Sequence, residues 1–415
     1  MTLSVGVQVK TLVTEASGTS IAPFMFRDNE IHYLAATSTT LYYRKYNVLT
    51  GQLTTVTSWN IENVLIPSGW PLSWITAVLS PDGNVVLGVV YTNPGNGTQQ
   101  GCVALINLST LSLTAGAYCN GTSQNGWACG RYLLLDYENG YIHHPFTVYT
   151  QGDYYCADGV WSYPSLSYVG TNYLSYGSGS GCPDCECPHA YVVGKCCGYL
   201  IAFASDCQYM AAIPPSRPTN AEFPFGVSSS VYWLSVVANE KYIVYLDTSG
   251  VLHVITPSSY PNTAFTFSQD CVPLALFGDL LLTTCSIIDL ASQSILVKLP
   301  IPIAFSGSAG SNSQFVMGNN AIFYDNGNTL NMVQFDPNIV VSMYASGSNI
   351  VIKVTRTDGT PLANKRVNVF QETTVSNINI FSSRLIASGT TGPDGTFSFS
   401  QSLLQSLMPF YVVVT

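Results

Sequence analysis

The densest group of side chains that could do chemistry in this 415-residue sequence lies near its middle. Four soft metal ligands follow one another with the spacing Cys-x-x-Cys-x-Cys-x-His: Cys182, Cys185, Cys187 and His189. Thiolates and an imidazole spaced in this way could complete the tetrahedral shell of Zn²⁺. The rival interpretation is an exposed loop closed by disulfides, because a glycine- and serine-rich run, Gly177–Gly181, comes directly before it. We favour disulfides and expect no metal or other cofactor, with zinc as the alternative.

The sequence contains 12 cysteines, and an even number indicates disulfides and an oxidising compartment or a hyperthermophilic cell. A hairpin that turns at Thr110-Leu111 would place Cys102 opposite Cys119, and one centred on Gly278 would place Cys271 opposite Cys285. Opposed residues of antiparallel strands lie about 4.5–5.5 Å apart at Cα, within reach of a disulfide. We therefore predict both pairs. The partners of Cys129, Cys156 and the cluster from Cys182 to Cys207 stay open.

Catalytic candidates are few. The adjacent pair His143-His144 could supply ligands or a base, but neighbouring side chains of a strand point to opposite faces and cannot readily share one ion. We expect one of them to be packed and the other exposed. Carboxylates that could act as a general acid and base all stand in turn-like sequence: Asp82, Asp136, Glu138, Asp153 and Asp158. Motifs of nucleophile elbows, zinc proteases and phosphate-binding loops are absent, so we predict a protein that is not an enzyme.

The composition restricts the class of protein further. Only 9% of the residues are charged, against about 25% in ordinary globular domains, and 26 are tyrosines. This composition suits a secreted, virion or cell-surface protein. The net charge is −9 and no basic run occurs, so we expect no nucleic-acid partner. No apolar stretch is long enough to span a membrane.

Short alternating runs bounded by Gly, Asn, Asp and Pro recur along the chain and predict an all-β fold. Three strand–turn–strand segments carry Asn47, Asn107 and Asp289 at the turn, at intervals of 60 and 182 residues that suggest one and three multiples of one spacing. With the turn Ser80-Pro81-Asp82-Gly83, these segments resemble the repeats of a six- or seven-bladed β-propeller. We place the propeller at residues 1–337. We expect its first strand, around Val5 to Val13, to complete the last blade and close the ring.

The C-terminal segment carries a second resemblance. Its motifs are Asn349–Thr355, the Asp358-Gly359 and Asp394-Gly395 turns with the strands that follow them, and Phe410–Thr415. They resemble the carboxypeptidase-regulatory, transthyretin-like sandwich, with its DG-x-PL and T-x-x-DG-x-F-x-F patterns. The resemblance implies an immunoglobulin-like β-sandwich over residues 338–415 that serves as a rigid docking module without chemistry of its own.

Together these features predict a non-enzymatic extracellular structural or adhesion protein, in style similar to surface proteins of thermophilic archaea and their viruses. We expect a virion or cell-surface component whose propeller attaches to a host receptor or glycan and whose sandwich anchors it to other structural subunits. Sequons at Asn96, Asn107 and Asn120 are candidate glycosylation sites. The alternative is a secreted propeller hydrolase or a lectin-like, carbohydrate-active protein.

Overall fold

The computed structural model describes the chain apart from residues 1–7, 96–98, 117–132, 151–152, 174–189, 197, 205–208, 215–218, 220–221, 227–230, 248, 269–270, 299–313, 337, 377–379, 405–409 and 415. Its secondary structure consists of β-strands and one short 3-10 helix, η1 (Gln401–Leu403), which confirms the predicted all-β class. Among the described residues, no helix has the length and apolarity needed to cross a membrane.

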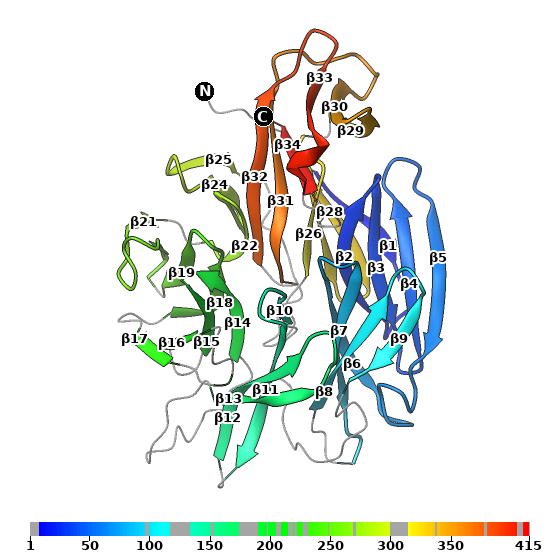
Figure 1. Ribbon diagram of the computed structural model, residues 1–415, viewed down its shortest axis with the longest axis vertical. Coiled ribbons are helices and arrows are strands. Elements are labelled where there is room, and N and C mark those ends of the chain that lie inside the picture. The colour runs from blue at the N-terminus through cyan, green and yellow to red at the C-terminus, as the bar shows by residue number, and fades with distance from the viewer. Residues whose placement is uncertain are drawn as a thin grey trace.

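Four-stranded antiparallel units follow one another through most of the described chain and surround a common centre (Figure 1). The first three are β2–β5 (Ser20–Arg27, Glu30–Ala36, Thr40–Asn47, Leu53–Asn60), β6–β9 (Leu72–Leu79, Asn84–Thr92, Gln99–Asn107, Ser112–Ala115) and β10–β13 (Leu134–Asp136, Tyr141–Thr150, Asp153–Ser162, Tyr168–Tyr173). The next three are β14–β17 (Ala190–Cys196, Tyr199–Ala204, Tyr209–Ile213, Glu222–Gly226), β18–β21 (Val231–Ala238, Ile243–Asp247, Val251–Ile255, Phe265–Ser268) and β22–β25 (Pro273–Phe277, Leu280–Thr283, Ser286–Asp289, Ser294–Lys298). This arrangement is that of a β-propeller.

The last unit is completed by the N-terminus of the chain. Strands β26 (Phe315–Gly318), β27 (Ala321–Asn326) and β28 (Thr329–Gln334) pair in order, and β1 (Gln8–Thr14) adds to β28 as the fourth strand. The pairing is antiparallel and runs from Gln8 opposite Gln334 to Thr14 opposite Thr329. β2 contacts both β6 and β26, so the first and last units meet. The described part of the first strand, Gln8–Thr14, thus completes the last unit, at the place where the sequence predicts a closing strand.

The repeated Asn and Asp residues occupy equivalent turns. Asn47, Asn107 and Asp289 each end the third strand of a unit, and the Oδ1 atom of each accepts hydrogen bonds from the backbone amides two and three residues ahead, at 2.9–3.5 Å. The predicted spacing was wrong in one respect, because the units of Asn107 and Asp289 are four apart and not three. The connection over residues 61–71 lengthens the first interval and so inflates the apparent repeat.

The C-terminal segment forms two small sheets that share one core. The first is β29–β30–β33 (Ile339–Ser346, Asn349–Arg356, Thr396–Ser400), and the second is β32–β31–β34 (Ile380–Thr390, Arg366–Ser376, Phe410–Val414). The predicted Asp-Gly turns are present, with positive φ angles of 86° at Gly359 and 75° at Gly395. Fully buried aliphatic side chains from both sheets fill the space between them: Ile352, Val354, Val367, Val369 and Val412.

Candidate functional site: a hairpin in the propeller centre

Strands β31 and β32 form the longest hairpin of the C-terminal segment, with 11 residues in each strand. The part of β31 from Val367 to Gln371 pairs with β34 and belongs to the small sheet. Bulges interrupt the β31–β32 register at Val369/Phe370 and again at Glu372/Thr374. A bulge bends a strand and increases its twist, so the hairpin changes direction where it leaves the sheet.

The far half of the hairpin enters the centre of the propeller (Figure 1). There β31 pairs with β10 in an antiparallel manner, Leu135 opposite Val375, while β32 pairs with β22 in a parallel manner, Leu276 opposite Ile380. The hairpin also contacts β6 and β14. The innermost strands of separate units are thereby joined into one 11-stranded sheet. The chain's own backbone occupies the channel around which propeller blades are arranged.

The base of the hairpin is fused to the propeller by an apolar core. Phe370 on β31 stacks on Tyr411 on β34, with ring centroids 5.4 Å apart and planes 19° apart. These two rings and Val413 share one buried cluster with residues of two propeller units, which include Leu274, Ala275, Phe315, Met317 and Ile322. The backbone amide of Asn320 also donates to the carbonyl oxygen of Val412 at 3.0 Å.

β34 is buried on both faces. Tyr411 and Val413 face the propeller, whereas Val412 and Val414 face the core between the two small sheets, as the alternation of a strand requires. The sequence pattern was expected to mark a separate docking module. In the structure, the β34 face that carries Tyr411 is covered by the propeller of the same chain, so this face is not available to another subunit.

The structure brings together two residues that sequence analysis had considered separately, His143 and Asp158. Nδ1 of His143 lies 2.6 Å from Oδ2 of Asp158, and Nδ2 of Asn172 donates to the same oxygen at 3.2 Å. His143 and Asp158 are both fully buried. His144 is also buried and points the other way, toward Gly88 and Gly101. The predicted opposite orientation is confirmed, but the expectation of one exposed histidine was wrong. His143 packs with Asp158 and Asn172 of its own unit, whereas His144 packs against the neighbouring unit β6–β9.

The candidate carboxylates Asp82, Asp136 and Asp158 do not converge, and Asp136 and Asp158 are buried. Asp82 accepts a hydrogen bond from the Tyr163 hydroxyl at 2.6 Å, and Oδ2 of Asp136 accepts one from Asn139 at 2.7 Å. Burial, followed by the hydrogen bond to Asp82, raises the pKa of Tyr163 to about 12, so its phenol stays protonated and donates. Asp82, Asp136 and Asp158 thus each have a separate polar partner. The Asp153 side chain lies outside the described residues.

One of the predicted disulfides is present, between Cys271 and Cys285, with a Cα separation of 5.9 Å. The hairpin turns at Gly278, and a bulge between Pro273 and Ala275 corrects the register so that the two cysteines face each other.

The other cysteine predictions lie mostly outside the described residues. In the β8–β9 hairpin Asn107 faces Ser112, so the turn begins earlier than the predicted Thr110-Leu111, and Cys102 lies with its sulfur 3.6 Å from the carbonyl oxygen of Leu65. Cys119 is not among the described residues, and its pairing with Cys102 stays a prediction. The same holds for the candidate zinc ligands Cys182, Cys185, Cys187 and His189 and for the sequons at Asn96 and Asn120. The side chain of Asn107 caps its turn.

The hairpin was the functional element that sequence reasoning missed. The recognised C-terminal motifs stop at Val369 and resume at Thr390, and the interval between them is the part of the chain that enters the channel. The length of that unassigned interval could have indicated the hairpin, because a small sandwich does not need two 11-residue strands.

No family model matches the chain, and no curated protein matches it. Among solved structures it is similar to a streptogramin B lyase, at 9% identity and a TM-score of 0.49 over 80% of this chain and 98% of that one. It is also similar to a catalytically inactive virginiamycin B lyase from Staphylococcus aureus with quinupristin, at 12% identity and a TM-score of 0.48 over 79% and 99% of the two chains. A third is the Dos1 propeller, at 10% identity and a TM-score of 0.37 over 76% and 67%. Similarity at this level carries no information about activity.

Proposed function

We propose that this chain is a non-enzymatic structural or adhesion protein of an extracellular surface, a component of a virion or of a cell envelope. It consists of a seven-bladed propeller, counted from the four-stranded units, and an immunoglobulin-like, transthyretin-like sandwich. The propeller presents a face to a host receptor or glycan, and the sandwich holds the protein among other structural subunits.

The observation that carries the proposal is the hairpin in the channel. The channel is the natural concavity of a propeller, and ligand sites of enzymes are concave with a few convergent polar groups. Here backbone pairing of β31 with β10 and of β32 with β22 fills that position. A rigid, plugged propeller suits a protein that presents its outer surface and loops.

Composition and covalent structure support an extracellular location. The Cys271–Cys285 disulfide is of the kind that persists in oxidising environments. A sequence with only 9% charged residues agrees with the style of surface proteins from thermophilic archaea and their viruses. We extend the proposal to such an organism or virus on this ground.

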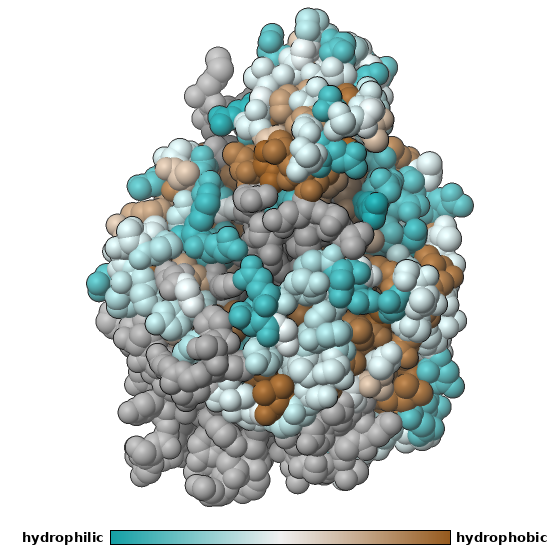
Figure 2. Space-filling model, viewed as in Figure 1, coloured by the Kyte–Doolittle hydropathy of each residue, from teal (hydrophilic) through white to brown (hydrophobic). Residues whose placement is uncertain are grey.

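The anchoring role is supported by apolar side chains on the C-terminal segment. Leu385 on β32 is 48% exposed and Leu403 in η1 is 45% exposed. Figure 2 shows apolar surface gathered on this part of the molecule, beside β32. Beyond its first two residues, β32 also has no strand partner on its outer edge within the described chain. An edge of this kind favours contact with a neighbouring subunit.

The test is to size the native particle or envelope fraction that carries the protein and to measure its intact mass with and without reduction. We expect the protein in a large assembly, with its mass rising by about two daltons for each disulfide reduced. A freely soluble monomer with bound zinc would overturn the structural role and restore the metal interpretation of Cys182 to His189.

The hydrolase alternative requires two carboxylates that reach one substrate bond, about 5–10 Å apart. Asp158 is enclosed with His143, and Asp82 is engaged with Tyr163. If the purified protein cleaved a sugar substrate and its Asp136→Asn variant did not, the hydrolase alternative would be supported.

A further inference from the structure

We propose that the exposed junction between the units β6–β9 and β10–β13 binds a neutral hexose unit of a glycan. The binding surface consists of Tyr137, Tyr163, Asp82 and Asn139, which we call the tyrosine platform. The inference rests on the proposed adhesion function and gives the chemical class of its ligand.

The platform is built on two tied turns. Tyr137 begins the turn between β10 and β11, and Tyr163 begins the turn between β12 and β13. The backbone amide of Tyr163 donates to the carbonyl oxygen of Gly140 at 2.7 Å, which holds the two turns together. The rings lie 5.6 Å apart at an angle of 58° and form an open corner.

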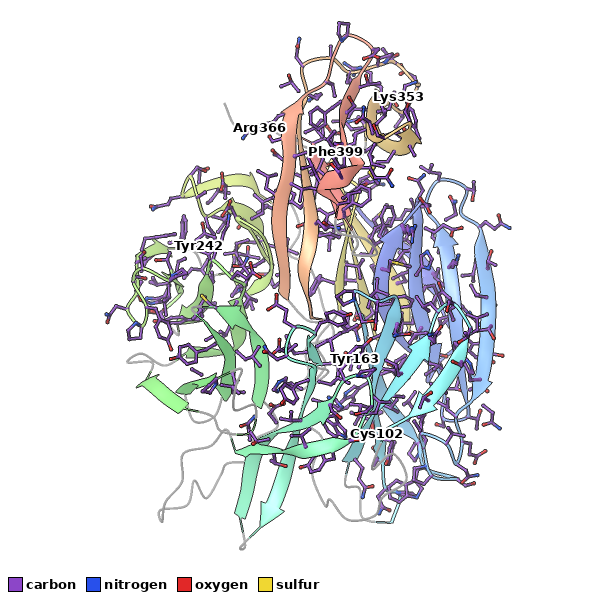
Figure 3. All side chains as sticks on the ribbon, in the orientation of Figure 1. Cys102, Tyr163, Tyr242, Lys353, Arg366 and Phe399 are labelled. Carbon is purple, nitrogen blue, oxygen red and sulfur yellow. A yellow bond between two sulfur atoms is a disulfide. The ribbon has the colours of Figure 1, made fainter. Side chains whose placement is uncertain are left out.

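Tyr163, labelled in Figure 3, is fixed by hydrogen bonds to the neighbouring unit. Its hydroxyl donates to Oδ1 of Asp82 at 2.6 Å, accepts from Nδ2 of Asn84 at 3.2 Å and lies 3.0 Å from Oγ of Ser80. All three partners belong to the predicted Ser80-Pro81-Asp82-Gly83 turn and its continuation. This network positions one wall of the corner before any ligand arrives, which lowers the entropic cost of binding.

Tyr137 is less enclosed than Tyr163. It is 41% exposed, so a large apolar face of its ring remains in contact with water and could be buried by a ligand. Pyranose rings have an apolar C–H face that packs on such an aromatic ring and hydroxyls that need acceptors around it. Oδ2 of Asp82 and Oδ1 of Asn139 have no hydrogen-bond partner within the described part of the chain and can accept from sugar hydroxyls.

Charge selects the class of sugar. Asp82 accepts the hydrogen bond of Tyr163 at this corner, Glu138 follows Tyr137 in the sequence, and the whole chain has a net charge of −9. An anionic sugar such as a sialic acid would be repelled by this negative charge. The platform therefore favours neutral hexoses and excludes sialylated or sulfated ones.

The experiment is saturation-transfer-difference NMR on the full chain with the methyl glycosides of glucose, galactose, mannose and N-acetylglucosamine, and with sialyllactose. A single shallow subsite implies a dissociation constant on the order of 1 mM. We expect signal from at least one neutral glycoside and none from the sialic acid moiety. Tyr137→Ala should weaken binding by about tenfold, whereas Tyr137→Phe, which keeps the ring, should stay within about twofold.

Tyr344→Ala is the matched control, because Tyr344 is 50% exposed on β29 of the C-terminal segment. It should bind sugar as the unchanged protein does. Absence of signal with every neutral glycoside, or equal binding by Tyr137→Ala with an unchanged melting temperature, would overturn the platform. The assembly state of the unchanged protein separates the two proposals. If the unchanged protein sits in a large assembly and Tyr137→Ala is retained there with lost sugar binding, both proposals are supported. If the unchanged protein is a free monomer that binds sugar and Tyr137→Ala does not bind it, only the platform is supported.

Discussion

The two ends of the chain both complete the propeller, but in different ways. The N-terminal strand β1 adds to the edge of β28 and is exposed along most of its length, with only Val13 buried. The C-terminal hairpin β31–β32 enters the channel and pairs with innermost strands on two sides. One end extends a sheet that is already formed by β26–β28, whereas the other joins units that are far apart in the sequence.

This difference predicts different energetic roles. An edge strand contributes one ladder of hydrogen bonds and one row of side chains. The C-terminal segment contributes ladders to β10 and β22 and also the apolar cluster around Tyr411, which contains side chains of two propeller units. We therefore expect the propeller and the C-terminal segment to unfold together, and the N-terminal strand to detach at lower cost.

The substitution with the largest expected effect on the C-terminal side is Tyr411→Ala. Tyr411 is 1% exposed and stacks on Phe370 inside the cluster shared with the propeller. Removal of a buried aromatic side chain costs about 3–5 kcal/mol of the free energy of unfolding. Urea denaturation followed by both far-UV circular dichroism and tryptophan fluorescence should show one coincident transition at lower urea.

Tyr344→Ala, at the half-exposed position on β29, is the control and should change the free energy of unfolding by less than about 0.5 kcal/mol. Two separate transitions in the Tyr411→Ala protein would show that the C-terminal segment is an independent module and would contradict the fused core.

The N-terminal side is tested by Val13→Asp. Val13 is 9% exposed and packs in a cluster with Ile21, Phe323 and Leu330. An unpaired carboxylate in that position should cost about 2–4 kcal/mol. Val9→Asp in the same strand is the matched control, because Val9 is 46% exposed and its change should cost less than about 0.5 kcal/mol. Equal effects of the two substitutions would show that β1 is not held by the side chain of Val13.

The same comparison explains what the sequence could and could not predict. The extended conformation of β1 and the Asn47, Asn107 and Asp289 turns follow from local alternation and turn chemistry, and the structure has both. The fused C-terminal core depends on contacts between residues more than 100 positions apart, such as Leu135 opposite Val375. The tyrosine platform depends equally on Asp82 meeting Tyr163 across two units. Pairings of that kind leave no local period in the sequence.

A smaller effect should come from the disulfide next to the channel. Cys271 and Cys285 bracket the β22–β23 hairpin, and β22 is the strand on which β32 docks. A crosslink that closes a loop with a sequence separation of 14 stabilises by about 3 kcal/mol, mainly by restricting the unfolded chain. The Cys271→Ser/Cys285→Ser variant should lose about that amount in urea denaturation without reductant. If amide hydrogen exchange in this variant becomes faster in β32 but not in β4 and β7, the disulfide stabilises the folded protein locally at the channel. If exchange becomes faster to the same extent in all three strands, the disulfide acts only by restricting the unfolded chain.

The last prediction concerns pH and the unit β2–β5, which contacts the unit that β1 completes. Burial, reinforced by the positive charges of Lys45 and Arg27, lowers the pKa of His32 from 6.5 to about 3, and its Nδ1 lies 2.6 Å from the Tyr43 hydroxyl. Between these pH values the unfolded chain takes up a proton at His32 and the folded chain does not. The free energy of unfolding therefore falls as the pH falls from 6.5 toward 3. Between pH 6.5 and 4.5 the unchanged protein should lose about 2 kcal/mol more than His32→Gln, measured by urea denaturation at both pH values. The carboxylates titrate in both proteins, so their contribution cancels when the two losses of unfolding free energy are subtracted. Equal losses in the two proteins would mean that His32 is protonated in the folded state and that the β2–β5 unit admits water at this position.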